Sequence, residues 1–211
     1  MSLEVYTIGH STHGIEAFLR LLKSAGITAI GDVRSQPYSR LNPQFSRNEL
    51  KRSLNTAGIK YVFLGKELGA RSNDASCYRN GQVQYDLLAK TDQFKAGIER
   101  VKEGAEKYRV ALMCAEKDPL DCHRTILVAR TLQEHHIAVK HILSSGKIES
   151  HAHAMDRLIS RLHVPKEDMF RSHEAALAEA YEKQADQIAY RKDKEPISSD
   201  YVGENRILEA H

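Results

Sequence analysis

The chain has few cysteines, no long apolar run and no leader-like N-terminus, and each absence excludes a class of protein. Three cysteines in 211 residues are too few for a disulfide scaffold, and their odd number indicates reduced thiols. No apolar run approaches the length that spans a membrane. The first residues, Met-Ser-Leu-Glu-Val, lack the basic segment and apolar core of a secretory signal. We therefore expect a cytoplasmic protein that does not enter a membrane.

Common nucleotide-binding and metal-binding signatures are also missing. The sequence contains no Walker loop and no Gly-x-Gly-x-x-Gly, which disfavours ordinary NTPases and dinucleotide-binding proteins. It has no Cys-x-x-Cys pair of the kind found in structural zinc sites. The net charge is +3, the hydrophobic content 41% and the charged content 28%. These values are typical of a globular protein, and the small positive charge favours anionic partners without being a nucleic-acid signature.

Short apolar runs alternate with helical patterns along the first two thirds of the chain. Runs typical of buried strands cover residues 5–8, 27–33, 59–64, 109–113 and 138–143. Helical spacing covers residues 15–25, 94–105 and a segment starting near Asp121, and a capping box from Ser46 to Glu49 opens another helix. This alternation predicts an α/β domain over residues 1–144, with a mostly parallel open sheet of about five strands and helices on both faces.

Polar side chains follow three of the predicted strands. The residues in these positions are His10, Ser11, Asp32, Arg34, Cys114 and Glu116. Parallel sheets bind ligands at the carboxyl ends of their strands. If the first, second and fourth strands are neighbours, these side chains line one crevice. The alternative is that Asp32 and Arg34 pair with each other or cap neighbouring helices.

The segment Cys114-Ala-Glu-Lys-Asp-Pro-Leu-Asp-Cys-His-Arg124 carries most of the predicted chemistry. Asp121 is a good N-cap, which would place Cys122, His123 and Arg124 in the first turn of a helix. Free backbone N–H groups and the helix dipole attract anions there, and Arg124 adds a planar cation. A thiol in this position has a lowered pKa, so Cys122 is a candidate thiolate. The alternative is that Cys122 is a buried and inert cysteine.

The same residues also suit a metal or a redox pair. Cys114, Cys122, His123 and His10 make a set of zinc or iron ligands. A redox pair of Cys114 and Cys122 requires their Cα atoms to lie within about 7 Å of each other. Cys77 lies in the long irregular stretch 65–91, which we expect to be a functional loop, and is expected to be a bystander. The preferred hypothesis requires no cofactor, and zinc or iron belongs to the alternative.

Several of these motifs occur together in one known family. They are Thr7-Ile-Gly-His-Ser11, Asp32-Val-Arg34, Pro37-Tyr-Ser-Arg40, Tyr61 with Leu68-Gly69, Tyr78-Arg79, Cys114-Ala-Glu116, Cys122-His-Arg124 and Val139-Lys-His-Ile142. In this combination the chain resembles the domain-of-unknown-function 488 family over residues 3–144. The resemblance implies a single α/β domain of bacterial and archaeal cytoplasmic proteins. It supports the set of site residues and names no reaction.

Together these residues predict a hydrolase or transferase that acts on a phosphorylated, nucleotide-like or nucleic-acid substrate. The candidate catalytic residues are Cys122, Cys114, His10, His123, Glu116 and Asp32. The candidate anion-binding or substrate-binding residues are Ser11, Arg34, Arg40, Tyr61, Tyr78, Arg79 and Arg124. Tyr38, Tyr61 and Tyr78 can stack on a base or hydrogen-bond a phosphate. The alternatives are a nucleotide-binding or nucleic-acid-binding module without catalysis, and a metal-binding or redox protein.

Beyond residue 144 the pattern changes. We expect a helical extension over residues 145–192 and a loosely ordered polar tail over residues 193–211. His151 and His153 are expected to face solvent at the start of the first of these helices. A long helix over residues 166–192 would pack on the domain or pair with a second copy in a homodimer. Its narrow stripe consists of Leu177, Tyr181, Gln184 and Ile188.

Overall fold

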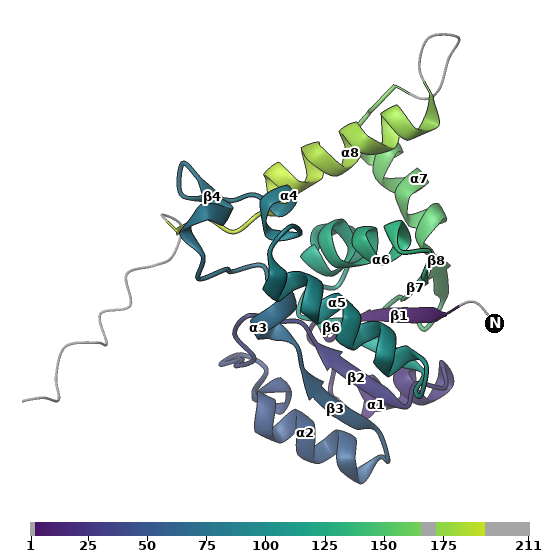
Figure 1. Ribbon diagram of the computed structural model, residues 1–211. Helices are drawn as coiled ribbons and strands as arrows, with labels where there is room; N and C mark the ends of the chain where they lie inside the picture. The colour runs from purple at the N-terminus through teal and green to yellow at the C-terminus, as the bar shows by residue number, and fades with distance from the viewer. Residues whose placement is uncertain (1–2, 166–171, 193–211) are drawn as a thin grey trace, which may run out of the picture.

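The computed structural model describes residues 3–165 and 172–192, which are built around a six-stranded sheet (Figure 1). Its strands are β1 (Glu4–Gly9), β2 (Ala29–Asp32), β3 (Lys60–Phe63), β6 (Val110–Cys114), β7 (Ala138–Ile142) and β8 (Ile148–Ser150). Their order is β3-β2-β6-β1-β7-β8, and all neighbours are parallel except β7 and β8. This confirms the predicted α/β fold. The antiparallel edge strand β8 was not predicted.

Helices and turns connect these strands. The α-helices are α1 (Ile15–Ser24), α2 (Arg47–Thr56), α3 (Gly65–Leu68), α4 (Tyr85–Leu88), α5 (Asp92–Ala105), α6 (Arg130–Glu134), α7 (His151–Arg161) and α8 (His173–Ile188). The 3-10 turns are η1 (Pro43–Phe45), η2 (Ala75–Cys77) and η3 (Pro119–Asp121), and the π-helix η4 (Arg124–Ala129) runs into α6. A small hairpin of β4 (Tyr78–Arg79) and β5 (Gln82–Val83) lies within the stretch expected to be a loop. Among the described residues, no helix is both long enough and apolar enough to cross a bilayer.

Helices cover both faces of the sheet, because alternate side chains of a strand point to opposite faces. In β6, Ala111 and Met113 pack in a core with α1 and α2. Val110, Leu112 and Cys114 pack on the other face, in a larger core with α5, α6, α7 and α8. The prediction of helices on both faces is therefore confirmed. The alternation along β6 places the Cys114 side chain on the face covered by α5.

The strands that carry the polar ends are neighbours. β6 lies between β2 and β1, with Gly9 opposite Cys114 and Asp32 opposite Met113. The chain proceeds from β1 to β2 and β3 on one side of β6, and then to β7 on the other side of β1. Such a reversal of strand order opens a crevice at the carboxyl ends of the strands. The first, second and fourth predicted strands are thus neighbours, as a single crevice requires.

Two local predictions about helix ends need correction. Helix α2 follows Ser46 as predicted, but the Ser46 side chain makes no capping bond. Its hydroxyl instead accepts a hydrogen bond from the Ser39 N–H at 3.2 Å, because the loop before the helix folds back over it. The second prediction, that Asp121 caps the helix after β6, is also wrong, because Asp118 caps the turn there. By contrast, Thr91 caps α5 by accepting a hydrogen bond from Phe94 N at 3.2 Å.

The C-terminal helices pack on the body of the domain. Helix α8 buries Ala176, Ala180, Tyr181 and Gln184 against α7, η3 and η4. Of the two predicted uses of its stripe, packing on the domain is the one observed, and a homodimer stays a prediction. The helix begins at His173, and the expected segment 166–171 lies outside the described residues, as does the expected tail 193–211.

A buried chain of hydrogen bonds joins the sheet to these helices. Thr7 Oγ1 lies 2.7 Å from His141 Nδ1, and His141 Nε2 lies 3.1 Å from His151 Nδ1. His151 Nε2 then lies 2.7 Å from the Tyr181 hydroxyl. The expectation that His151 faces solvent is wrong. The residue is only 5% exposed, because its ring packs between β7 and α8 and contacts a side chain of each. His153 is exposed as expected.

Candidate functional site

The strand ends open into a cavity of about 840 Å³. Eight of the predicted site residues line it, namely His10, Ser11, Arg34, Arg40, Cys114, Glu116, Cys122 and His123. They come from the ends of β1, β2 and β6, from the loop before η1 and from the turn before η4. The tertiary structure thus brings together residues that span more than a hundred positions of the chain.

One wall of the cavity is a network around Arg34. The Arg34 Nε and NH2 groups donate to the two oxygens of Asp32 at 2.9 and 2.7 Å, and NH2 also donates to the Phe45 carbonyl at 2.9 Å. The Tyr61 hydroxyl donates to Asp32 at 2.8 Å. Arg34 NH1 lies 3.2 Å from His10 Nε2. These contacts match the alternative prediction that Asp32 and Arg34 pair, and they hold a cation at the cavity wall.

Burial decides the charge states in this network. The pKa of His10 is lowered to about 4, mainly by burial and also by the charge of Arg34. A neutral His10 can donate from Nδ1 to the Ser11 carbonyl, 2.9 Å away, and accept from Arg34 at Nε2. Burial and the charge of Asp32 raise the pKa of the Tyr61 hydroxyl, so it stays a donor. Both nitrogens of His10 are therefore engaged in orienting neighbours.

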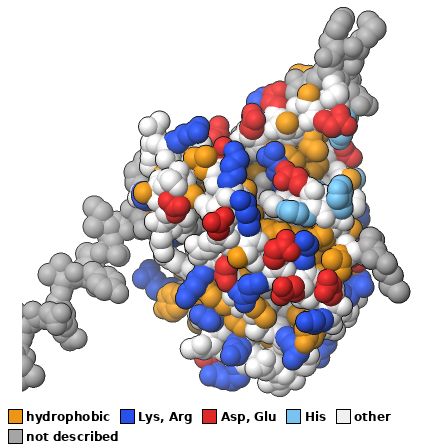
Figure 2. Space-filling model, viewed as in Figure 1, with side chains coloured by type: hydrophobic (Ala, Val, Ile, Leu, Met, Phe, Trp, Pro, Cys, Tyr) orange, Lys and Arg blue, Asp and Glu red, His pale blue; other side chains and the backbone are white. Residues whose placement is uncertain are grey.

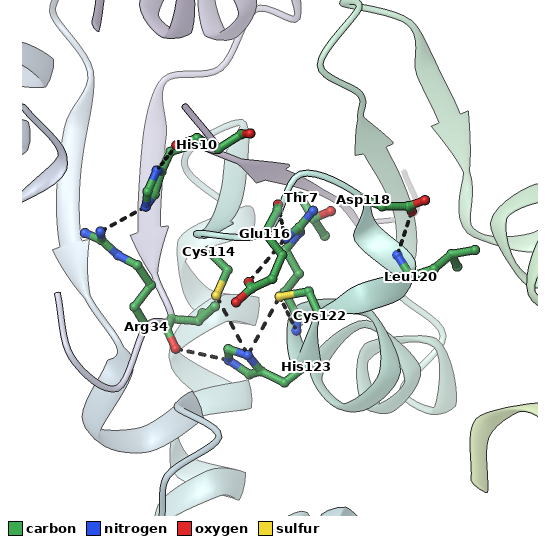
Figure 3. A network of polar contacts seen from close by, with 12 residues as sticks. Thr7, His10, Arg34, Cys114, Glu116, Asp118, Leu120, Cys122 and His123 are labelled. Atoms are coloured by element: carbon green, nitrogen blue, oxygen red, sulfur yellow. Dashed lines mark hydrogen bonds and ion pairs between the residues drawn. The ribbon is translucent and has the colours of Figure 1, made fainter. Parts of the chain in front are cut away.

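The floor of the cavity is a group of three buried side chains, Cys114, Cys122 and His123, called here the Cys–His cluster. Both sulfurs lie 3.8 Å from His123 Nδ1, and Figure 3 shows them directed toward the same edge of the imidazole ring. His123 Nε2 lies 3.1 Å from the carbonyl oxygen of Val33. Because a carbonyl only accepts, Nε2 carries a proton, so Nδ1 is the nitrogen that faces the sulfurs. Burial opposes a charged ring, but the neighbouring Cys122 and Glu116 raise the pKa of His123, so Nδ1 carries a proton beside a Cys122 thiolate and a lone pair when the ring is neutral.

The start of the following helix differs from the prediction. Asp118, not Asp121, caps the turn η3 by accepting from Leu120 N at 2.9 Å. Cys122 then adopts an extended conformation, and its carbonyl accepts the first helical hydrogen bond, from Thr125 N at 3.0 Å. The Cys122 sulfur accepts from Arg124 N at 3.4 Å. The thiol therefore occupies the place beside the free N–H groups that we expected an anion to take.

The two thiols of the cluster differ in acidity. The hydrogen bond to Cys122 and burial raise the pKa of Cys114. Burial alone would raise the pKa of Cys122 as well, but the Cys114 hydrogen bond and the charges of Arg124 and His123 together lower it. Burial raises the pKa of Glu116, and the neighbouring Cys122 adds to this effect. Cys122 is the first sulfur of the pair to become a thiolate.

The other predicted residues lie behind or beside the cavity. Arg124 is only 1% exposed, and its NH1 donates to the Glu116 carbonyl at 2.9 Å. Its buried side chain therefore stabilises the turn that follows β6. Tyr61 lies behind Asp32. Tyr78 donates from its hydroxyl to the Ser72 carbonyl at 2.7 Å, and Arg79 is exposed in the same hairpin. These last two are not among the residues that line the cavity.

Sequence reasoning missed the contribution of the C-terminal helices. Ile188 and Tyr190 line the cavity, together with Tyr85, Tyr38 and Arg71. The side chain of Arg71 stacks on the Tyr190 ring, with 4.6 Å between the guanidinium carbon and the ring centroid. The helical stripe predicted a packing role for Ile188, and no local motif marks Ile188 or Tyr190 as a cavity residue. Only the packing of α8 brings them to the strand ends.

The same helices also hold the turn that carries the Cys–His cluster. Arg157 of α7 donates to both oxygens of Asp118, at 2.9 and 3.1 Å. Gln184 of α8 donates to the Leu120 carbonyl at 2.8 Å. The turn before Cys122 is therefore shaped by contacts from beyond residue 144, which explains why its geometry did not follow from local sequence.

Comparisons with known proteins identify a family without a described activity. Neither the curated proteins nor the solved structures include a significant match to the chain. The family model described as "Domain of unknown function DUF488" matches residues 14–131, which include β2, β6 and the whole Cys–His cluster. Because this match covers more than half of the chain, the protein belongs to the DUF488 family.

Proposed function

We propose that the protein is an enzyme that binds a phosphorylated or nucleotide-like substrate in the strand-end cavity and acts on it with the Cys–His cluster. The observation that carries this proposal is the position of that cluster. Three buried, reactive side chains lie at the floor of a cavity of about 840 Å³, where a parallel sheet offers its binding crevice. Titratable groups with shifted pKa values that meet in a cavity are the usual starting point for locating an active site.

The wall residues support an anionic substrate. Arg34, Arg40 and Arg71 line the cavity, and Ser11 adds a hydroxyl. Guanidinium groups bind phosphate through paired, charge-assisted hydrogen bonds. Asp32 takes the Nε and NH2 donors of Arg34, so Arg40 and Arg71 would supply the paired contacts and Arg34 would add its NH1 group beside His10.

The cavity favours a compact substrate, and the one face shown in Figure 2 is not a continuous basic surface. On the face shown in Figure 2, acidic and basic side chains lie interspersed with apolar ones. A protein that binds nucleic acid along a surface usually gathers its cations on one face. Recognition inside the cavity, with Tyr38 at the rim available to stack on a base, is consistent with a nucleotide or a nucleic-acid end.

Two chemistries fit the cluster. A metal-free Cys122 thiolate would form a bond to phosphorus while the bond from phosphorus to the leaving oxygen breaks, and water would later release the phosphoryl group. That route requires an accessible sulfur, but Cys122 is 1% exposed and Cys114 is 4% exposed. Alternatively, the sulfurs act as metal ligands and do not themselves react. The burial of both sulfurs favours the second route.

The test is a binding and turnover screen with matched variants. Binding of inorganic phosphate and of nucleoside monophosphates would be measured by calorimetry, and hydrolysis would be followed with a panel of phosphate mono- and diesters. Arg40→Ala should weaken binding roughly tenfold or more, the value of a charge-assisted hydrogen bond. Arg52→Ala, at an exposed arginine of α2 outside the cavity, is the control.

The outcomes separate the hypotheses. Turnover that is lost in Cys122→Ser and kept in Cys77→Ala, a buried cysteine outside the cluster, supports an enzyme. Binding without turnover of any ester supports a binding module. If neither phosphate nor nucleotides bind at low salt, the proposed substrate class is wrong.

A further inference from the structure

We propose that Cys114, Cys122 and His123 bind a zinc ion whose fourth coordination position is open to the cavity. The three ligand atoms all lie within 4.8 Å of one another, and all three residues are buried. The proposal deepens the proposed function, because it says which chemistry the cluster would bring to the substrate. Zinc binding by these three residues does not require the proposed function to be correct. Only the identity of the molecule in the fourth coordination position rests on the proposed function.

The distances agree with tetrahedral coordination. With Zn–S bonds of about 2.3 Å and Zn–N bonds of about 2.0 Å, a tetrahedron places sulfur about 3.6 Å from nitrogen. Both sulfurs of the cluster lie 3.8 Å from His123 Nδ1. The sulfur–nitrogen distances are thus within a few tenths of an ångström of the tetrahedral value, and the two sulfurs lie within 4.8 Å of each other. Both separations lie near the upper limit for hydrogen bonds to sulfur, and one shared central ion would account for their equal length.

The surroundings of His123 are those of a metal ligand. Its Nε2 lies 3.1 Å from the Val33 carbonyl, which fixes the tautomer that leaves Nδ1 free to coordinate. Ligating histidines usually donate their second N–H to a carbonyl or carboxylate in this way. The sulfur of Cys122 accepts from Arg124 N at 3.4 Å, so a backbone N–H is placed to stabilise a zinc-bound thiolate.

Three protein ligands leave one position for water or substrate, as in catalytic zinc sites. His10 was a candidate fourth ligand from the sequence. Its Nε2 faces Arg34, and it is not part of the group of ligand atoms within reach of one another. Glu116 also lines the cavity beside the cluster, where its carboxylate can contact a zinc-bound water. Zinc lowers the pKa of a bound water toward neutrality, which would supply a nucleophile in the buried floor of the cavity.

Zinc suits this ligand set better than iron. Two thiolates and one imidazole form a common zinc site, whereas iron–sulfur clusters take four ligands, usually all cysteine. Cys77, the remaining cysteine, is buried outside the group. Zinc also needs no geometry beyond a tetrahedron, which a rigid strand end and a turn can provide.

Metal analysis of the purified full-length protein is the direct test. Wild type and Cys77→Ala should each carry about one zinc per chain, or take it up when zinc is added. Cys114→Ser, Cys122→Ser and His123→Ala should lose more affinity than the roughly 10–100-fold that loss of an outer partner costs. Cobalt substitution of the wild type should give the absorption of a tetrahedral site with thiolate ligands.

A second measurement on the wild type avoids the risk that a variant fails to fold. Two thiols should be slow to react with a thiol reagent in the zinc-loaded protein and should become reactive when a chelator removes the metal. A folded wild type that neither contains nor binds zinc would overturn the proposal, as would iron at equal stoichiometry or a Cys114–Cys122 disulfide in the native protein. Phosphate binding measured on both the zinc-loaded and the metal-free sample tests the substrate class separately: binding in neither sample counts against the proposed substrate, whatever the metal content.

Discussion

Acidification should destabilise this protein through the buried histidine chain between β7 and α8. Burial lowers the pKa of His151 to about 4, whereas an unfolded histidine titrates near pH 6.5. Between these values the unfolded state binds more protons, so stability falls as pH falls. The stabilising contribution is complete above about pH 6.5 and is lost as pH approaches 4.

The size of this effect follows from the two pKa values. Going from pH 7 to pH 5, the proton uptake by an unfolded His151 should cost about 2 kcal/mol of unfolding free energy. Below pH 4 the loss should reach about 3 kcal/mol. Burial and the charges of its neighbours, His151 first, also lower the pKa of His141, which adds a loss of the same sign. The native fold of the C-terminal helices should therefore be sensitive to mild acid.

Urea unfolding at pH 7, 6 and 5, followed by circular dichroism, measures the effect. In His151→Gln the loss between pH 7 and pH 5 should be smaller than in wild type by about 2 kcal/mol, because one titrating group is gone. His153→Gln changes an exposed histidine of the same helix and should keep the wild-type pH dependence. If wild type and His151→Gln lose stability in parallel, the reasoning from burial is refuted.

Three substitutions test how the site is held together. Gly9→Ala should cost at least about 3 kcal/mol or prevent folding, because its Cβ would lie 1.8 Å from the Glu116 carbonyl oxygen; thermal unfolding measures this, and a stable variant would contradict the close approach. Asp32→Asn should cost about 3–5 kcal/mol in chemical denaturation, because it leaves the buried Arg34 without its counter-ion, and a loss under 1 kcal/mol would show that the pair is dispensable. Arg157→Ala should cost about 1–3 kcal/mol and speed hydrogen exchange in η3, which it holds, whereas unchanged exchange there would count against such a role.

The sequence was sufficient to place the site on one edge of the fold. Apolar runs identify the strands, and the polar residues that end them, such as His10, Arg34 and Cys114, therefore share the carboxyl edge of a parallel sheet. It could not establish that β6 lies between β1 and β2, since strand order depends on crossovers and not on local pattern. Sequence alone therefore predicted a shared crevice only if these strands were neighbours, and the sheet order showed that they are.

Local sequence failed where distant contacts shape the chain. A helix was predicted to start near Asp121 with Asp121 as its cap; the start agrees to within two residues, but Asp118, held by Arg157, caps the preceding turn and Cys122 precedes the helix. The resulting extended conformation brings the Cys122 sulfur into the same group as Cys114 and His123. Such contacts connect residues more than thirty positions apart and leave no periodic signal.

By itself, the sequence determined the α/β class, the helices on both faces and the residues that gather at the strand ends, because these follow from the period of apolar side chains and from the rules of parallel sheets. Only the tertiary structure decided which of those residues contact one another and so form separate groups. It joined Asp32 to Arg34 as a fixed wall and grouped the Cys–His cluster at the floor of the same cavity. The physical reason is that burial and hydrogen-bond partners, which set the chemistry of each side chain, come from segments far away in the chain.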